Sequence, residues 1–267
     1  MNESDEKPSQ NMLSEQYKDA SNFNVRIQTF QSLSRQTTDF YAWIFSQIAK
    51  TPNSRVLELG CGTGRLWQKN LERIPTGWDI TLSDFSPGML KATQNNLSQS
   101  ERHFAFQVID AQSIPFEDAS FDILIANLML YHVPDRSRAF AEIRRVLKPR
   151  GVFYAATSSH LTLAPLSKLA QEAGITFKMS LDGFHLENGA QQISQWFSQV
   201  ELALLENTLV ATEAEPLLAI ARSILPQNQY SEAVFERLRA CIQQEIALHG
   251  PIHSNMDTGL FKATGHR

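Results

Sequence analysis

Short runs of apolar residues alternate along the chain with stretches of helical spacing. Each run is nearly continuous, as is typical of parallel strands that helices cover on both faces. A helix is predicted to begin at Pro87, because Ser86 before it suits an N-cap and proline suits the first helical position. The repeated order of strand and helix predicts an α/β fold with a parallel sheet and right-handed crossovers. The five predicted strands lie within residues 55–59, 80–84, 104–111, 123–128 and 152–156.

Less regular segments flank this alternating region. Helical spacing within residues 13–50 predicts N-terminal cap helices. Residues 158–189 lose clear periodicity and contain one proline and three glycines, which indicates a lid or substrate loop. Farther on, we expect more helices, a strand at 200–205 and a last strand that begins at Gly259.

Residues 55–64 read Arg-Val-Leu-Glu-Leu-Gly-Cys-Gly-Thr-Gly, an apolar run that ends in three alternate glycines. A loop without side chains at the carboxyl end of a parallel strand lets a flat, polar ligand lie against backbone. The spacing does not match the Gly-x-Gly-x-x-Gly fingerprint for dinucleotides, because Thr63 and Arg65 stand where its last glycine is required. The Gly-Lys-Ser/Thr ending of a phosphate-binding loop is missing too.

The glycine segment resembles motif I of the class I S-adenosylmethionine-dependent methyltransferases, in which an acid and an apolar residue precede Gly-x-Gly-x-Gly. Later motifs follow in family order, so the resemblance covers roughly residues 50–160. It implies a Rossmann-like, doubly wound sheet of seven strands, mostly parallel with one antiparallel strand, with helices on both faces. The implied cofactor is S-adenosyl-L-methionine, and the methyltransferase domain is expected over residues 51–267. The residues of this segment expected at the cofactor are Glu58, Gly60, Cys61, Gly62 and Gly64.

An acid ends the second predicted strand. Asp84 follows Gly64 by 20 residues, the spacing at which a carboxylate accepts hydrogen bonds from ribose hydroxyls in nucleoside-binding sheets. Phe85 comes next and is expected at the cofactor. Met89, on the helix that follows, is expected to face either the cofactor or the core.

Polar residues also follow the third and fourth predicted strands. In the family, an acid and a small residue after the third strand contact the adenine, which here implies Asp110 and Ala111. Asn127 ends the fourth strand and completes the expected cofactor set. The next segment resembles a Leu-His-His-Val-Pro-Asp stretch of small-molecule methyltransferases, with Tyr131 in place of the first histidine. The resemblance places Tyr131 and His132 near the reacting methyl group as candidate catalytic residues. His132 suits a general base there, or alternatively a histidine that packs against the cofactor.

Motifs that the sequence lacks narrow the class of the methyl acceptor. After the fourth strand there is no Asn-Pro-Pro-Tyr of the amide and adenine methyltransferases, and no Pro-Cys of the cytosine type. The formal charge is −4, and the cations at 144–150 suit a solvated helix end better than a phosphate footprint. These features favour a small-molecule acceptor over nucleic acid. An RNA or protein methyltransferase and a cofactor-binding module without turnover remain the alternatives.

Composition sets the remaining expectations. Cys61 and Cys241 are the only cysteines, and no histidine pattern accompanies them, so neither a disulfide framework nor a metal site is indicated. No apolar run is long enough to cross a bilayer. Residues 1–12 are polar without an apolar signal segment, which predicts a disordered tail on a cytoplasmic protein. The oligomeric state is left open.

Overall fold

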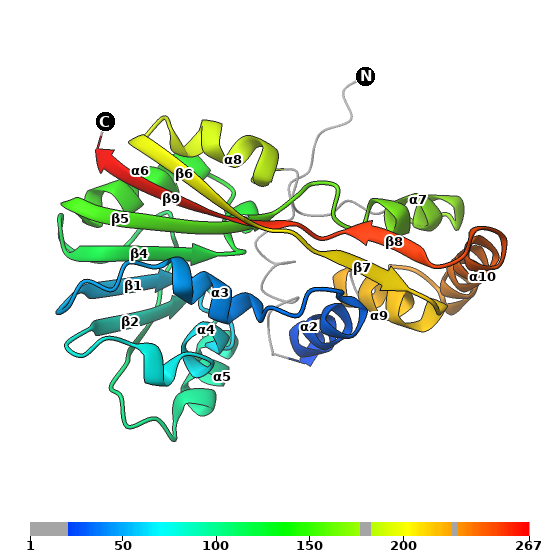
Figure 1. Ribbon diagram of the computed structural model, residues 1–267, viewed down its shortest axis with the longest axis horizontal. Helices are drawn as coiled ribbons and strands as arrows, with labels where there is room; N and C mark the ends of the chain where they lie inside the picture. The colour runs from blue at the N-terminus through cyan, green and yellow to red at the C-terminus, as the bar shows by residue number, and fades with distance from the viewer. Residues whose placement is uncertain (1–20, 177–182, 226–228, 267) are drawn as a thin grey trace. The chain divides into compact units, whose positions relative to one another are not determined.

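The computed structural model describes residues 21–176, 183–225 and 229–266, and they fall into two compact units (Figure 1). We call them the sheet unit and the helical unit. Among the described residues, the sheet unit comprises 38–160, 183–206 and 257–266. The helical unit comprises 21–37, 161–176, 207–225 and 229–256.

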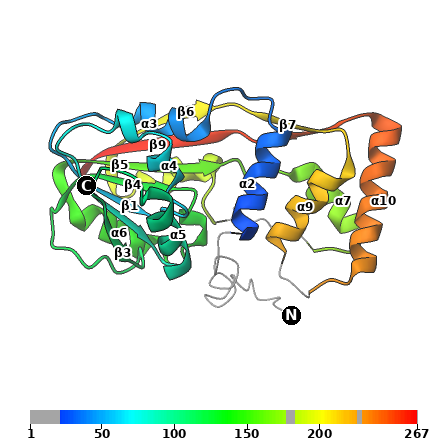
Figure 2. The same cartoon turned by 90° about the horizontal axis from the view of Figure 1, so that it is seen from below.

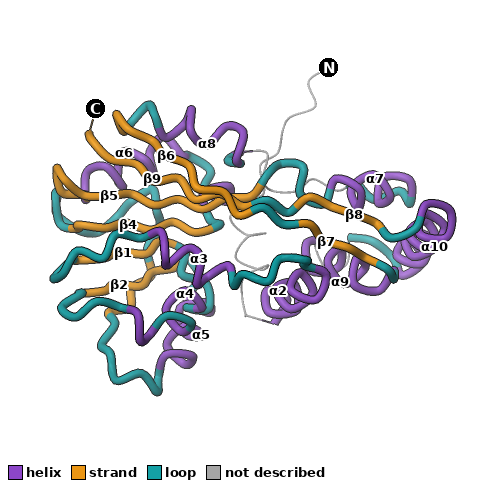
Figure 3. The backbone as a smooth tube through the Cα atoms, in the orientation of Figure 1, coloured by secondary structure: helices purple, strands orange, loops and turns teal. Residues whose placement is uncertain are grey.

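The sheet unit is built on a seven-stranded sheet in the order β3-β2-β1-β4-β5-β9-β6 (Figure 3). Strand β9 runs antiparallel to both of its neighbours, whereas the pairs from β3 to β5 are parallel. The predicted seven-stranded sheet with one antiparallel member is therefore confirmed. The strands are β1 (Arg55–Leu59), β2 (Asp79–Asp84), β3 (Ala105–Val108), β4 (Phe121–Asn127), β5 (Leu147–Ser158), β6 (Phe197–Leu205) and β9 (Thr258–His266).

Helices cover both faces of this sheet, as predicted. Neighbouring residues of β1 face opposite sides: Val56 packs into a core with α3 (Phe40–Gln47), α4 (Arg65–Gln68) and α5 (Pro87–Leu97). Leu57 packs into the other core, together with residues of α6 (Arg136–Val146) and α8 (Leu186–Ile193). Burial on both faces explains why the strands are almost continuously apolar. Two short 3-10 helices complete the unit, η1 (Leu71–Arg73) and η2 (Leu130–His132).

The helix cap predicted at Ser86 is present, and Asp135 supplies a second cap on the other face of the sheet. The Ser86 hydroxyl accepts a hydrogen bond from the Met89 N–H at 3.2 Å, and α5 begins at Pro87. The Asp135 carboxylate accepts from the Arg138 N–H at 3.0 Å at the start of α6. Both caps satisfy backbone donors that the first helical turn leaves unpaired.

The helical unit has an apolar core of its own. Figure 2 shows α2 beside α9 and α10 beside α7, and a two-stranded antiparallel sheet of β7 and β8 completes the unit. Among the described residues, none of the helices combines the length and the apolar character that crossing a bilayer requires. The elements are α2 (Ser21–Leu33), α7 (Ala164–Glu172), β7 (Thr208–Ala211), α9 (Ala214–Ile224), α10 (Glu232–His249) and β8 (Ile252–Asn255).

This grouping differs from the division expected from the sequence into cap helices at 13–50 and a domain at 51–267. Leu33 of α2 shares a core with Leu166 of α7, Leu217 of α9 and Leu238 of α10, so distant segments form one unit. The expected lid, residues 158–189, contains α7 and the first residues of α8, and a lid role stays a prediction. Residues 177–182 and the expected tail at 1–12 lie outside the described residues.

Candidate cofactor site

The loop after β1 consists of left-handed backbone at alternate residues. Gly60, Gly62 and Gly64 have φ angles of 69°, 58° and 73°, a region that side chains with a Cβ rarely adopt. Space is short as well. A Cβ on Gly60 would lie 2.8 Å from the Cβ of Met129, and a Cβ on Gly64 would lie 2.7 Å from Cγ2 of Thr93. Glycine is thus required here by backbone conformation and by packing.

Asp84, the last residue of β2, ties this loop to the next helix. Its Oδ2 accepts the Gly62 N–H at 2.9 Å and its Oδ1 accepts the Ser86 N–H at 2.8 Å. Burial raises the pKa of Asp84, while the bonds from Ser86, Gly62 and Phe85 act to lower it. A carboxylate has about four lone-pair sites, so with these three bonds Asp84 can still accept at least one more. The neighbouring Phe85 ring is 48% exposed.

A buried carboxylate connects β1 to β4. Glu58 accepts a hydrogen bond from Trp67 Nε1 at 2.5 Å and another from Asn127 Nδ2 at 3.2 Å. Burial raises the pKa of Glu58 to about 7, although both hydrogen bonds act to lower it. Asn127 Oδ1 is buried and has no hydrogen-bond partner among the residues that the structure describes. A buried acceptor without a donor is costly, and a ligand with N–H groups would satisfy it.

The segment after β4 carries backbone strain. Leu128 has a φ of 52°, and its N–H donates to the Ala156 carbonyl at 2.9 Å. Left-handed backbone in a non-glycine residue costs roughly 1–3 kcal/mol and is concentrated at functional sites. Tyr131 and His132 follow on η2 with ring centroids 4.4 Å apart, and both are half-buried.

The turn after β3 is held by its own side chains. Asp110 accepts from the Gln112 N–H at 2.9 Å and from Gln112 Nε2 at 3.0 Å. Ala111 beside it is buried. This is an Asx turn, which presents the carboxylate at the edge of the sheet.

Strand register places these groups on one edge. Leu59 is paired with Ser83 of β2 on one side and with Ala126 of β4 on the other, so the chain leaves the three strands at the same level. Direct hydrogen bonds join the expected residues Gly62 to Asp84 and Glu58 to Asn127. The chain order reverses between β1 and β4, and ligands of open α/β sheets bind at such a switch point.

Two expected residues pack inside the protein. Met89 is 1% exposed. The Cys61 thiol is buried 3.6 Å from the Thr93 hydroxyl, and burial raises its pKa.

Sequence reasoning missed three residues that shape the site. Met129 fills the space over Gly60, and Trp67 donates to Glu58. Burial raises the pKa of Tyr41 on α3 to about 12, with the charges of Arg65 and Glu58 acting on it in opposite directions. The only signal for Tyr41 was a hydroxyl within an otherwise apolar helix segment.

Comparisons with known proteins point to one family. Residues 57–155 match a family model described as a methyltransferase domain. Demethylmenaquinone methyltransferase of Renibacterium salmoninarum is 31% identical over 137 residues, which cover 51% of this chain and 55% of that protein. Malonyl-[acyl-carrier protein] O-methyltransferase of Geobacter sulfurreducens is 37% identical over 101 residues, or 38% of this chain and 37% of that one.

A solved structure shares the fold over most of the chain. Phosphoethanolamine N-methyltransferase 2 of Haemonchus contortus, in complex with phosphomonomethylethanolamine and S-adenosylhomocysteine, superposes with a TM-score of 0.57 at 20% identity. The match covers 96% of this chain and 59% of that one. The chain spans about half or less of the length of the two curated relatives named above.

Proposed function

The chain belongs to the class I S-adenosylmethionine-dependent methyltransferases, and we propose that it transfers a methyl group from S-adenosyl-L-methionine to a small organic acceptor. The observation that carries the proposal is the meeting of the glycine loop, Asp84 and Asn127 at one edge of the sheet. That edge falls within the matched methyltransferase domain.

The described side chains fit the cofactor at each of its parts. In our proposal, Asp84 receives a ribose hydroxyl with its remaining lone pair, and the Phe85 ring and Asp110 lie along the adenine. The glycine loop admits the methionine part against backbone. Asn127 Oδ1, buried and without a partner among the described residues, accepts from the α-ammonium group.

Glu58 acts through its neighbours in this proposal. Its hydrogen bond from Asn127 Nδ2 orients the amide so that Oδ1 is directed away from Glu58. Trp67 holds the other carboxylate oxygen. Glu58 therefore supports the site from the core.

Bound cofactor would supply an electrophilic methyl group on a sulfonium. The chain then has to hold the acceptor in line with that methyl and exclude water, which accounts for much of the acceleration in such a reaction. Tyr131 and His132, adjacent on η2, are the residues that we propose contact the acceptor. His132 would take the acceptor's proton, because an imidazole titrates near neutral pH.

A small acceptor is favoured by charge and by the relatives. Two cations of the 144–150 cluster are paired with acids: Arg145 with Asp118 at 2.9 Å and Lys148 with Asp122 at 2.8 Å. Cations paired in this way are less able to neutralise phosphates. The relatives are named for demethylmenaquinone and for a malonyl group on a carrier protein, and we propose that an organic oxygen, nitrogen or carbon nucleophile is methylated here too.

Calorimetry on two variants of one strand tests the cofactor site. Asp84→Asn changes the last residue of β2, and Asp79→Asn changes its exposed first residue as the matched control. Losing the charge that a ribose hydroxyl would meet should weaken S-adenosylmethionine binding about 100-fold, or ~2.7 kcal/mol. The control should bind like the wild type. Equal affinities for the two variants would refute the assignment of Asp84.

A labelling experiment tests the acceptor class. The protein is incubated with methyl-labelled cofactor and a metabolite extract, with RNA and protein fractions assayed in parallel. We expect label in a small molecule, and a much slower transfer by a His132→Ala variant that still binds the cofactor. Label found only in RNA or protein refutes the small acceptor, and cofactor binding without any transfer indicates a module without turnover.

A further inference from the structure

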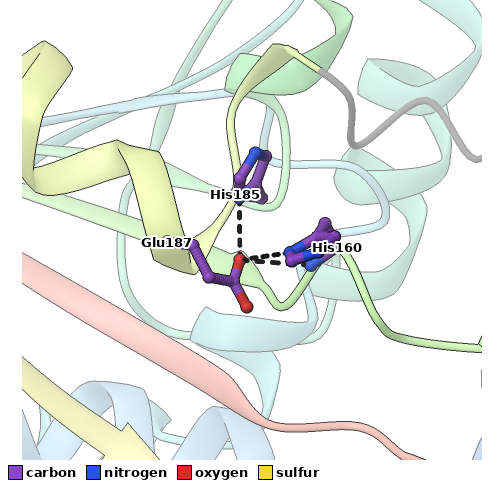
Figure 4. A group of neighbouring side chains, drawn as sticks. All are labelled: His160, His185 and Glu187. Atoms are coloured by element: carbon purple, nitrogen blue, oxygen red, sulfur yellow. Dashed lines mark hydrogen bonds and ion pairs between the residues drawn. The ribbon is translucent and has the colours of Figure 1, made fainter.

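Two histidines and a glutamate meet at a second place in the sheet unit (Figure 4). His160 follows the end of β5, and His185 and Glu187 lie at the start of α8. Nδ1 of His160 lies 3.0 Å from Glu187 Oε2, and Nδ1 of His185 lies 2.7 Å from the same oxygen. The two imidazole rings are 5.0 Å apart.

Surrounding groups hold these side chains in place. The Ser159 hydroxyl donates to Glu187 Oε1 at 2.6 Å, which leaves Oε2 directed at the imidazoles. The backbone N–H of His160 donates to Glu187 Oε2 at 3.3 Å, and the backbone N–H of His185 donates to Asn188 Oδ1 at 2.9 Å. Glu187 therefore has one oxygen fixed by a hydroxyl and one shared by both histidines.

Both imidazole nitrogens face the same carboxylate oxygen, Oε2 of Glu187. A carboxylate facing two imidazole nitrogens has the chemistry of a binding site for a metal cation.

Two imidazoles and one carboxylate form the donor set of many sites for divalent transition metals, and Zn²⁺ accepts nitrogen and oxygen ligands at about 2.0–2.2 Å. At such bond lengths, neighbouring ligands of a tetrahedral ion lie roughly 3.3 Å apart. The two histidine nitrogens lie 3.0 Å and 2.7 Å from Oε2, so small side-chain movements would admit the ion. A hydroxyl on the outer carboxylate oxygen is the kind of support that metal ligands use.

We propose that His160, His185 and Glu187 bind a divalent transition-metal ion of the zinc class. The ion would replace the hydrogen-bonding protons between the imidazoles and Glu187. The His160 and Glu187 side chains are 47% and 40% exposed, so a fourth position is open to water or to an oxygen ligand. The site lies on residues separate from those assigned to the cofactor, and the proposal does not depend on methyl transfer.

Bound metal would join the end of β5 to the start of α8. A ligand that binds the folded protein alone raises its stability in proportion to the logarithm of its concentration over the dissociation constant. Zinc should therefore raise the thermal midpoint of the protein. Ligating imidazoles must be unprotonated, so this increase should shrink in acid.

The experiment uses the full chain without a histidine tag, stripped of metal with a chelator. Zn²⁺ is titrated by calorimetry, and Co²⁺ is added separately to read the visible bands of a four-coordinate ion. We expect one ion per chain, and affinity lower by about 100-fold or more in His160→Ala and His185→Ala. Ser159→Ala should weaken binding about 10-fold, because it leaves the ligands in place but frees Glu187.

His249→Ala is the matched control. His249 Nδ1 lies 3.1 Å from Glu245 on α10, and this pair is not part of a group of three metal-ligating residues among the described residues. This variant should bind zinc like the wild type and show the same rise in thermal midpoint. Circular dichroism checks that every variant is folded.

Two results would overturn the metal site. One is wild-type zinc affinity in the folded His160→Ala and His185→Ala variants. The other is a wild-type protein that gains neither a bound ion nor thermal stability with zinc, which would leave the three residues as a hydrogen-bonded cluster only. Neither result bears on cofactor binding, which Asp84→Asn tests separately.

Discussion

Strands β1 and β4 are neighbours in the sheet, and the chain leaves each of them through a residue in left-handed backbone. We call Gly60, after β1, the first exit and Leu128, after β4, the second exit. Gly60 has a φ of 69° and no room for a side chain, because Met129 lies directly over it. Leu128 has a φ of 52° and keeps a branched side chain, and its N–H is held by the Ala156 carbonyl. At the first exit, neither the backbone conformation nor the packing admits a side chain. At the second exit, a leucine is held in strained backbone close to Tyr131 and His132, the residues proposed to contact the acceptor.

The largest effect is expected at the first exit. Gly60→Ala introduces a Cβ 2.8 Å from the Met129 Cβ. The Met129 Cβ is bonded directly to the backbone, so a change of side-chain rotamer cannot relieve the contact. Left-handed backbone and overpacking together should lower the free energy of unfolding by about 2–5 kcal/mol. Urea unfolding measures the loss, and calorimetry should show that cofactor binding falls with it.

Two further variants separate these causes. Gly174→Ala, just past the end of α7, has a φ of 86° with only the flexible end of Arg237 within 4 Å of the added Cβ, so it should show the backbone cost alone, about 1–2 kcal/mol. Met129→Gly combined with Gly60→Ala should recover the packing part in a double-mutant cycle. Strict additivity of the two changes would mean that Met129 does not restrict Gly60.

The backbone conformation at the first exit can be predicted from the sequence, whereas the conformation at the second exit cannot. Gly60, Asp84 and the Ser86 cap follow from local spacing, since each acts within a short stretch of chain. The left-handed backbone at Leu128 is fixed by the hydrogen bond that its N–H donates to the Ala156 carbonyl of β5, and a leucine in the sequence gives no sign of it. The sequence therefore predicts a local feature where a turn, a strand end or a helix cap requires one particular type of residue.

Contacts between distant segments were the part that sequence reasoning could not reach. The packing of Leu33 with Leu217 and Leu238 defines the helical unit, yet helical spacing shows only that each segment has an apolar face. His160 and Glu187 lie in the segment 158–189 that was expected to be a lid or substrate loop, and no metal site was expected from the sequence. They come together only because the start of α8 lies beside the end of β5.

The second largest effect concerns Glu58, which links the two strands. Its pKa is about 7 in the folded protein against an ordinary value of 4.5, so between these values the folded state holds a proton that the unfolded state has lost. Stability should accordingly fall as pH rises from about 4.5 to about 7, by about 3 kcal/mol. Urea unfolding across this pH range measures the slope.

Glu58→Gln cannot titrate and should flatten that slope. Glu72→Gln, on the exposed η1, is the control and should keep the wild-type slope. If the Glu58→Gln protein lost stability with pH as steeply as the control, the buried carboxylate would have to be ionised already at low pH.

A smaller effect is expected from Asn127 at the end of β4. Removing its amide with Asn127→Ala should weaken S-adenosylmethionine binding about 10-fold, or ~1.4 kcal/mol, through the loss of one acceptor for the ammonium group. Asn96→Ala is the control. Asn96 donates to the Thr63 carbonyl in the glycine loop after β1, and no cofactor contact is proposed for it. Equal affinities would make Asn127 a structural partner of Glu58 alone.

The smallest expected effect tests the strain at the second exit. Leu128→Ala keeps a Cβ in left-handed backbone, whereas Leu128→Gly removes it, and both lose the same leucine packing. The glycine variant should be the more stable of the two by about 1 kcal/mol. At Leu202, exposed on β6 and absent from the positive-φ residues, the order should reverse, because glycine in a strand costs about 0.5–1 kcal/mol relative to alanine. Matching signs at the two leucines would show that Leu128 stores no strain, and the two strand exits would then differ in packing alone.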